Sequence, residues 1–363
     1  MKKLILVVLI FMVLTLGCIN QQKNNLISDK NINSNQNINS QIYLVSPYQN
    51  IDWNKVSNYR ANLHTHSNQS DGVLDVNEVI KLYADANYSI LSITDHDTVN
   101  SKLATKTENV DSNMLLILGN EISSAHHFNL YFCDYLNDDQ NFLVGGNQTA
   151  IFARENNCLM VINHPYFYNN YVDNIHDYYD YNWYLNLYKK YADVLFSLEV
   201  FNQGDRYALD NYLNSPRHLW DKLNYDLLPD KIVFGLSNDD FHSPIDGFRN
   251  YQTFFLEKLD LNSFKYALTN GNYYFSYQFD ANGGKITAPI INQIKTNEKF
   301  VEINFENALT IEIITDVGEM MVVEKLNSNN FKFDYSNLKN KKFFRIVLKN
   351  NFGESYTQPF YFK

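Results

Sequence analysis

The sequence has few cysteines and no excess of basic residues. Each of these shortages argues against certain classes of protein. Its three cysteines, Cys18, Cys133 and Cys158, form no Cys-x-x-Cys pair, which argues against a zinc ribbon or a disulfide framework. Cys133 and Cys158 could pair in an oxidising compartment, although we expect two separate buried thiols. The formal net charge is −10, whereas proteins that bind long nucleic acids usually carry a basic surface. We therefore expect no long duplex nucleic acid as a partner.

The N-terminus lacks an apolar run long enough to cross a bilayer comfortably. The run over residues 4–16, preceded by two lysines, has the length of a signal-peptide core. Cys18 then resembles a lipoprotein cleavage and acylation site, although Thr15 and Leu16 depart from the usual aliphatic and small residues. We predict a signal peptide over residues 1–18, lipidation of Cys18, and an extracytoplasmic protein anchored to a membrane. An uncleaved N-terminal anchor is the alternative.

The next residues are polar, and regular structure is expected only from about residue 58. Residues 19–41 are dominated by Asn, Gln, Ser and Lys and lack the apolar periodicity of a packed element. We predict a polar linker over residues 19–57, a catalytic domain over residues 58–282 and a small β-domain over residues 283–363.

Short apolar runs alternate with amphipathic stretches in the catalytic domain, which predicts parallel strands joined by helices. Active sites of α/β barrels lie just past the carboxyl ends of such strands. From about residue 285 strand-like runs separated by turns predict a small antiparallel β-sandwich. In the catalytic domain, strands are expected at residues 88–94, 114–118, 158–162, 194–201 and 232–236, and helices at residues 74–86, 151–156 and 219–223.

Ionisable side chains collect at the ends of these expected strands. His64 and His66 lie in an extended segment, where alternation puts both imidazoles on one side, and Asp71 follows after a short turn. Of the nine histidines, only His176 and His218 lie outside such clusters. Mixed imidazole and carboxylate ligands suit Zn, Mn or Fe, and their number predicts two or three divalent ions. The clusters contain His64, His66, Asp71, Asp95, His96, Asp97, Glu121, His126, His127, His164, Glu199, Asp239, Asp240 and His242.

In this order, the segments HTHSNQSDG, TDHDT, GNEIS, HHFN, INHP and NDDFH resemble the motifs of the PHP (polymerase and histidinol phosphatase) superfamily of metal-dependent phosphoesterases. The resemblance covers about residues 58–280 and is greatest to its carbaryl-hydrolase-like branch, which carries a GHFN-type segment and a small β-domain. It implies an α/β fold in which a distorted (β/α)7 barrel of the PHP type precedes a small antiparallel β-sandwich-like domain. The metals would lie at the C-terminal mouth of the barrel.

The resemblance also implies three groups of metal ligands. His126 stands where the family commonly has Gly, and we prefer His127 because the family histidine directly precedes Phe-Asn. We prefer Asp240 to Asp239 because its Asp-x-His spacing fits. One metal would be held by His64, His66, Glu121 and Asp240, a second by Asp71, His96 and His242, and a third by His127 and His164, with Glu121 as a bridge.

We therefore expect a hydrolase that cleaves phosphate esters through a metal-bridging hydroxide. Its substrate would be a small phosphorylated molecule or a short oligonucleotide, as in the nucleotide phosphatases and 5′-to-3′ exonucleases of the superfamily. One alternative is a carbamate or carboxylic ester hydrolase that uses the same metals. The other is a surface lipoprotein that binds a metal or ligand without turnover.

A few further residues have two interpretations each. Asp95 could orient His96 or simply cap the preceding strand. Arg206 could bind the phosphate of the substrate or be an ordinary surface arginine, and the same holds for Arg60. Residues 166–191, rich in Tyr, Asn and Asp, could form a lid or pack as ordinary helix.

Overall fold

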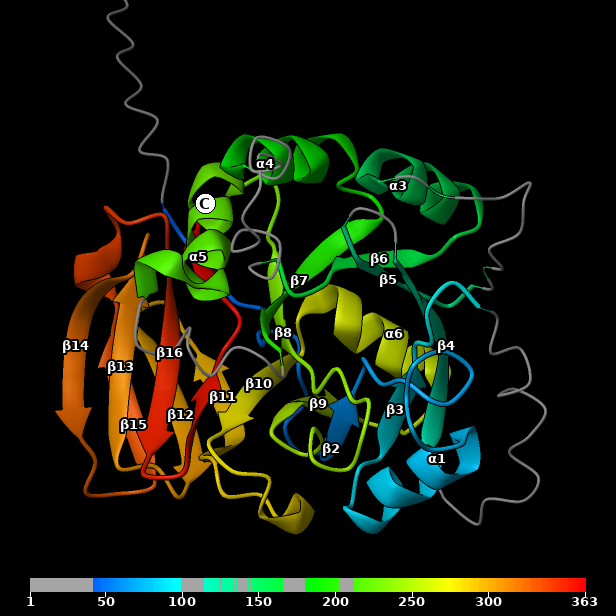
Figure 1. The fold of residues 1–363 in the computed structure, drawn as a ribbon. Helices are drawn as coiled ribbons and strands as arrows, with labels where there is room; N and C mark the ends of the chain where they lie inside the picture. Colours follow the sequence, from blue (N-terminus) through cyan, green and yellow to red (C-terminus); the bar gives the residue numbers. More distant parts are fainter. Residues whose placement is uncertain are drawn as a thin grey trace, which may run out of the picture. The chain divides into compact units, whose positions relative to one another are not determined.

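A mixed β-sheet carries most of the predicted metal ligands at the ends of its strands (Figure 1). In this computed structural model the described residues are 42–98, 114–123, 126–133, 135, 143, 145–165, 180–202 and 212–363. Residues 42–363 belong to one compact unit. The strands that surround the site lie in the order β9 (Asn250–Leu256), β2 (Ser57–Asn62), β3 (Ile90–Ile93), β4 (Leu115–Ile122), β5 (Phe128–Tyr131), β6 (Leu159–Ile162), β7 (Leu195–Phe201) and β8 (Phe234–Ser237).

Most neighbours in this part of the sheet are parallel, but β5 is not. Strands β2, β3 and β4 are parallel, as are β6, β7 and β8. Strand β5 is antiparallel to both β4 and β6, and β9 is antiparallel to β2. The N-terminal end of β5 therefore lies at the same edge as the carboxyl ends of β4 and β6, so that His127 reaches the site from before a strand. Strand β5 was not among the strands expected from the sequence, and it interrupts the otherwise parallel order between β4 and β6. The (β/α)7 barrel stays a prediction.

Local sequence determines where the first helix begins. The Asp75 carboxylate accepts hydrogen bonds from the backbone of Asn77 and Glu78, and the Glu78 carboxylate accepts one from Asp75 N at 3.0 Å. This capping box satisfies backbone N–H groups that an uncapped helix leaves free. The described helices are α1 (Val76–Asp85), α3 (Gly145–Glu155), α4 (Tyr181–Lys190), α5 (Pro216–Leu227) and α6 (Leu261–Asn270), with 3-10 turns η4 (Tyr212–Asn214), η5 (Asn282–Gly284) and η6 (Ser336–Leu338).

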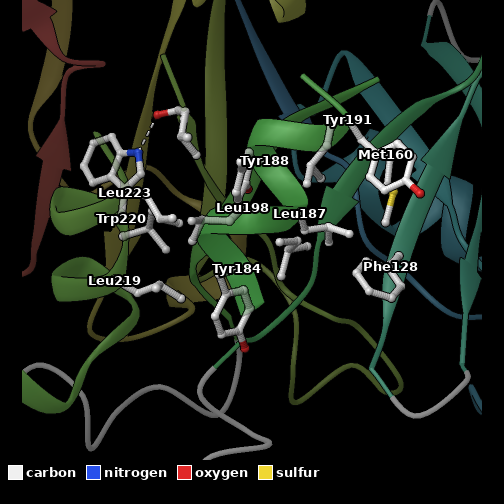
Figure 2. Packing of buried hydrophobic residues seen from close by; sticks show 14 of the residues in the cluster. Phe128, Met160, Tyr184, Leu187, Tyr188, Tyr191, Leu198, Leu219, Trp220 and Leu223 are labelled. Carbon is white, nitrogen blue, oxygen red and sulfur yellow. Dashed lines mark hydrogen bonds between the residues drawn. The ribbon is translucent and has the colours of Figure 1, made fainter. Parts of the chain in front are cut away.

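Helices α4 and α5 bury an aromatic and aliphatic layer against the strands (Figure 2). Trp220 of α5 is fully buried and donates its Nε1–H to Val233 O at 2.8 Å. Tyr188 of α4 is also buried and donates its hydroxyl to Ser197 O at 2.8 Å. Aromatic side chains of this kind remove a large area from water while their polar tips stay hydrogen-bonded. This layer packs against β7 and against the residues just before β8. Both strands supply polar groups to the site.

The C-terminal strands form two sheets that face each other across a second apolar core. Ile303 of β12 and Ile346 of β16 lie in this core. One sheet contains β11 (Ile290–Thr296), β12 (Phe300–Glu306) and β15 (Asn330–Asp334), and the other contains β13 (Thr310–Thr315), β14 (Glu319–Lys325), β16 (Phe343–Asn350), β17 (Gly353–Tyr356) and β18 (Phe360–Phe362).

The second of these sheets is continuous with the site-bearing sheet. Strand β10 (Tyr273–Gln278) pairs with β9 on one side and with β17 on the other. The predicted boundary between residues 282 and 283 therefore does not separate two sheets, and an independent second domain stays a prediction.

The segment before β2 belongs to the fold, which corrects the linker predicted over residues 19–57. Strand β1 (Leu44–Val45) pairs antiparallel with β18. Tyr48 is 1% exposed, donates its hydroxyl to Tyr273 O at 3.0 Å, and accepts a hydrogen bond from Gln358 N at 2.8 Å. Residues 42–57 are thus packed, because this buried tyrosine and the short strand provide the apolar contact that the polar stretch before them lacks.

The predicted signal peptide and the remainder of the linker, residues 1–41, lie outside the described residues, and so does Cys18. None of the helices in the described part of the chain has the length and apolar character needed to cross a bilayer.

Cys133 and Cys158 form a disulfide, with their Cα atoms 5.3 Å apart. The expectation of two separate thiols is therefore wrong. The bond joins the chain just after β5 to the chain just before β6, and these two strands are antiparallel neighbours. Adjacent ends of an antiparallel pair bring the two cysteines together although 25 residues separate them.

Candidate metal centre

His64 and His66 follow β2 in an extended segment that is fully buried. Its backbone is held on both sides, since His66 N donates to Phe241 O at 2.7 Å and the Thr65 hydroxyl donates to Ser92 O at 2.8 Å. Alternation along the extended chain turns both imidazoles to one side and Thr65 to the other. The sheet thus fixes the position of two rings before any metal binds.

Four side-chain atoms converge at the innermost part of the site. His64 Nε2 lies 3.1 Å from Glu121 Oε2 and 3.1 Å from Asp240 Oδ1. His66 Nε2 lies 3.2 Å and 3.1 Å from the same two oxygens, and 3.1 Å from His64 Nε2. Ligands on a tetrahedral ion with bonds of about 2.0–2.1 Å lie about 3.3–3.4 Å apart. The inner group of His64, His66, Glu121 and Asp240 therefore fits a tetrahedral ion in both donor type and spacing.

The Glu121 carboxylate stands between several imidazoles, and its two oxygens face different ones. Besides the inner group, Oε2 lies 3.3 Å from His96 Nδ1. Oε1 lies 3.1 Å from His127 Nδ1 and 3.1 Å from His164 Nε2, and accepts a hydrogen bond from Asn163 Nδ2 at 2.8 Å. A carboxylate whose two oxygens face different imidazoles is suited to bridge two metal ions.

An outer group adjoins the inner one and is more exposed. Asp71 Oδ2 lies 3.2 Å from His242 Nε2 and 3.4 Å from His96 Nε2. The side chains of Asp71, His242 and His96 are 51%, 32% and 22% exposed, whereas His64 is 0% exposed. His96 Nδ1 is buried without a hydrogen-bond partner. This nitrogen faces Glu121 Oε2 at 3.3 Å, and a cation shared by the two atoms would satisfy both, so it fits a metal ligand.

The structure brings together all nine residues that the sequence predicted as ligands. The predicted second group of Asp71, His96 and His242 is gathered, and His66 lies beside it. For the predicted third group, His127 and His164 both meet Glu121 Oε1, and His127 also forms a potential metal group with His96 and Glu121. The sharing of His96 between the second and third groups is a difference from the predicted grouping.

The electrostatics of the metal-free cluster reflect its mixture of rings and carboxylates. Burial acts to lower the pKa of His66, but hydrogen bonds to Asp240 and Glu121 outweigh it and raise the pKa to about 9. Burial acts to raise the pKa of Glu121, whereas His64 and the hydrogen bonds from His127 and His164 hold it well below its usual range. The carboxylates thus stay ionised, which metal ligation requires.

His126 and His127 face in different directions. His127 meets Glu121, whereas His126 Nε2 lies 3.0 Å from the Tyr184 hydroxyl and its ring stacks against both Phe128 and Trp183. Burial lowers the pKa of His126 to about 3. The structure therefore places the preferred residue, His127, at the cluster and leaves a neutral His126 in the packing beneath it.

Asp239 and Asp240 also divide their roles. Asp240 faces His64 and His66, as preferred. Asp239 is fully buried and accepts hydrogen bonds from the backbone N–H groups of Phe248, Arg249 and Asn250 at 2.7, 3.0 and 2.9 Å. It thereby anchors the chain that follows the site.

The structure places Asp95 against the loop after the His-x-His pair. Its carboxylate accepts hydrogen bonds from Ser67 N and Ser67 Oγ at 2.6 Å and from Ser70 Oγ at 2.9 Å. The proposed orientation of His96 by Asp95 stays a prediction. The Asp97 carboxylate accepts hydrogen bonds from the backbone N–H and the hydroxyl of Ser123.

Arg60 is buried and is therefore not a surface arginine. Its guanidinium lies 4.0 Å and 4.2 Å from the ring centroids of Tyr88 and Tyr251, and it donates to Gly284 O at 2.7 Å. Because its guanidinium contacts two aromatic rings, Arg60 contributes to packing. Arg206 lies outside the described residues, as do residues 166–179 of the predicted lid and His176. In residues 180–191, Tyr184 and Tyr188 are buried in the core.

Glu199 was noted in a polar cluster but given no role, and the structure places it directly against the metal centre. Its Oε1 lies 2.8 Å from His64 Nδ1. The signal in the sequence is a carboxylate inside the otherwise apolar run LFSLEVF of β7, where an unpaired charge would be costly.

Comparison with known proteins supports the superfamily suggested by the motifs. Residues 62–223 match the model of the PHP domain. None of the curated proteins matches the chain. The match supports PHP superfamily membership, whereas the carbaryl-hydrolase-like branch stays a prediction.

Several solved structures are similar at low identity. A two-domain protein from Bacteroides vulgatus that contains a predicted PHP-like metal-dependent phosphoesterase is 16% identical, with 86% of this chain and 89% of that chain covered and a TM-score of 0.41. An amidohydrolase from Chromobacterium violaceum is 14% identical, with 51% and 88% covered and a TM-score of 0.37. A lesion-specific endonuclease from Pyrococcus furiosus is 16% identical, with 60% and 57% covered and a TM-score of 0.41.

Proposed function

We propose that this chain, whose residues 62–223 match the PHP domain, is a metal-dependent hydrolase that cleaves phosphate esters. The observation that carries the proposal is the convergence of His64, His66, Glu121 and Asp240 within 3.1–3.2 Å, beside a second and more exposed group. When bound, two or three divalent ions (Zn, Mn or Fe) would activate water and neutralise charge on the phosphoryl oxygens. The residues of the chain would hold these ions in fixed positions.

With a third ion bound, the charge of the site would favour an anionic substrate over a neutral ester. Asp71, Glu121, Asp240 and Glu199 are the carboxylates of the centre, and their formal charge balances two divalent ions. A third ion would leave a surplus of positive charge, which a phosphate monoester or diester would offset. A carbamate or carboxylic ester is neutral and would not, so we rank that activity second.

The exposure of the ligands supports a direction of approach for the substrate. The inner rings of His64 and His66 are inaccessible, whereas Asp71 and His242 reach solvent. A phosphoryl group would therefore meet the outer group first. The net charge of −10 disfavours a long duplex, so we propose a small phosphorylated molecule or a short oligonucleotide as the substrate.

A substrate panel tests the proposal. Protein reconstituted with Mn²⁺ or Zn²⁺ is assayed with p-nitrophenyl phosphate, bis-p-nitrophenyl phosphate, nucleotides and a 5′-labelled oligonucleotide, beside p-nitrophenyl acetate and an aryl methylcarbamate. We expect phosphoester turnover that a chelator abolishes, and a large loss in His242→Ala but not in His218→Ala, a partly exposed histidine outside the centre. Turnover of only the acyl substrates would support the second function, and metal uptake without any turnover would support a binding protein.

We also propose that the protein works outside the cytoplasm, attached to a membrane through an N-terminal lipid or anchor. The leader-like residues 1–18 and Cys18 motivate this proposal. The Cys133–Cys158 disulfide supports it, since disulfides persist mainly in oxidising compartments. In cell fractions, we expect the native protein in the membrane fraction, with no free thiol at positions 133 and 158. The Cys18→Ser variant should differ from the native protein in its labelling by lipid. Cytoplasmic protein with two reactive thiols would contradict the proposal.

A further inference from the structure

Glu199 is a charged side chain that the proposed metal chemistry does not use as a ligand. It stands in the middle of β7 and is 0% exposed. Four nitrogen atoms surround its two oxygens, and three of them are donors. Oε1 lies 2.8 Å from His64 Nδ1 and accepts from Asn238 Nδ2 at 2.8 Å, and Oε2 accepts from His164 N at 2.9 Å and from Asn202 Nδ2 at 3.0 Å.

We propose that Glu199 is a positioning residue that determines which ring nitrogen His64 presents to the metal centre. The proposal rests on the metal-dependent function proposed above. A neutral imidazole carries one N–H, and a metal binds the other nitrogen. If Nδ1–H donates to Glu199, the lone pair of Nε2 points at the position shared by His66, Glu121 and Asp240. Carboxylates that orient metal-binding histidines in this way commonly raise metal affinity.

The neighbours of Glu199 require a group that only accepts hydrogen bonds. On the Oε2 side, the N–H of His164 belongs to the backbone and cannot reverse. On the Oε1 side, the Asn238 amide is fixed, because its Oδ1 already accepts from Leu63 N at 3.0 Å and from Gln252 Nε2 at 3.1 Å. An ionised carboxylate accepts at both oxygens, whereas a glutamine must place an NH₂ group on one side.

The substitution Glu199→Gln should therefore disturb either His64 or His164, depending on the side to which its NH₂ group turns. With its NH₂ group on the Oε1 side, glutamine would meet a donor at Asn238 and would donate to His64 Nδ1. The neutral ring would then carry its hydrogen on Nε2, where the metal must bind. With its NH₂ group on the other side, glutamine would oppose the N–H of His164 and shift the backbone of that ligand. Either outcome weakens the centre without altering a ligand.

Metal affinity provides the first test, in the full chain and by competition with a chelator. We expect Glu199→Gln to bind the innermost Zn²⁺ about 10- to 100-fold more weakly than wild type. Asp221→Asn is the matched control, because Asp221 is another fully buried carboxylate but is bonded to Arg345 and Tyr212. Its folded fraction should keep wild-type affinity.

A spectroscopic measurement on the wild type keeps the proposal testable even if the variant does not fold. In Zn²⁺-loaded protein with ¹⁵N-labelled histidine, the His64 ring should carry its hydrogen on Nδ1. A hydrogen on Nε2, or wild-type Zn²⁺ affinity in Glu199→Gln, would overturn the positioning role. Normal metal binding by the wild type without phosphoester turnover would instead overturn only the proposed function, and wild-type protein that binds no metal would overturn both.

Discussion

Arg345 on β16 and Asp221 on α5 form a bidentate ion pair inside the protein. Nε and Nη2 of the arginine lie 2.8 Å and 2.7 Å from the two carboxylate oxygens, and the side chains are 3% and 0% exposed. Tyr212 donates a hydrogen bond to the same carboxylate at 2.7 Å. The pair joins the C-terminal strands to the helix that packs behind β7.

Breaking this pair should destabilise the whole unit. Asp221→Asn leaves the Arg345 guanidinium buried without a carboxylate, which typically costs about 3–5 kcal/mol. Urea unfolding followed by circular dichroism measures the loss. Arg154→Gln, which breaks the exposed pair of Arg154 with Asp193, should cost less than about 1 kcal/mol. Similar small losses in both variants would show that the buried pair contributes little.

Glu121 should be the most sensitive ligand, because its two oxygens face different groups of imidazoles. Glu121→Gln keeps the size of the side chain but removes the charge that would offset two ions. We expect the loss of at least one ion per chain and a phosphoesterase rate lowered by more than about 100-fold. Elemental analysis and the phosphoester assay measure both effects.

His164→Ala is the comparison for Glu121→Gln, since His164 meets only one oxygen of that carboxylate. We expect a milder loss of rate, roughly 10-fold. If Glu121→Gln keeps near-normal metal content while His164→Ala loses it, the bridge must be another carboxylate, such as Asp71 or Asp240.

Stability should depend on pH in opposite directions with and without metal. In the metal-free protein the pKa of His66 is raised from 6.5 to about 9, so the protonated ring stabilises the fold fully below pH 6.5. That contribution should fade as pH rises to about 9. Metal requires the neutral ring, so binding should tighten over the same window. Thermal unfolding from pH 6 to 9, with Zn²⁺ and with chelator, measures both trends. A flat profile for the metal-free protein would contradict the raised pKa.

Two truncations should separate the tether from the fold. Removal of residues 1–41 should leave a folded, active protein, because β1 and Tyr48 remain. Removal of residues 1–57 also deletes Tyr48, whose loss should cost at least about 3 kcal/mol, as for other large buried aromatics. Unfolding midpoints and phosphoesterase rates of both chains provide the comparison. Equal stability would mean that residues 42–57 contribute nothing to the fold.

The chemistry of the site was easier to predict than the connections of the sheet. His96, Glu121 and His164 lie at or just after the apolar runs of β3, β4 and β6, and a polar residue at such a place has few inexpensive structural roles. Strand β5 was not predicted, because a run of four residues that includes an asparagine gives only a weak strand signal, and such a short run does not indicate the direction of a strand.

Other features depended on distant partners. Tyr48 follows a polar stretch, and its burial arises from contacts with Tyr273 and Gln358, more than 200 residues away. The role of Glu199 was missed for the same reason, since its four nitrogen neighbours come from three other segments of the chain and from its own strand end. The Cys133–Cys158 bond depends on the same antiparallel pairing of β5 with β6 that the apolar pattern could not reveal.

The gradient of exposure across the metal centre has a consequence for ion exchange. An ion held by His64, His66, Glu121 and Asp240 could leave only after buried side chains move apart, whereas one held at Asp71 and His242 would face solvent on one side. The two positions should therefore differ in lifetime as well as in affinity. The outer ion would equilibrate with its surroundings and could vary in identity with the metals available, while the inner ion would be retained from the time of folding.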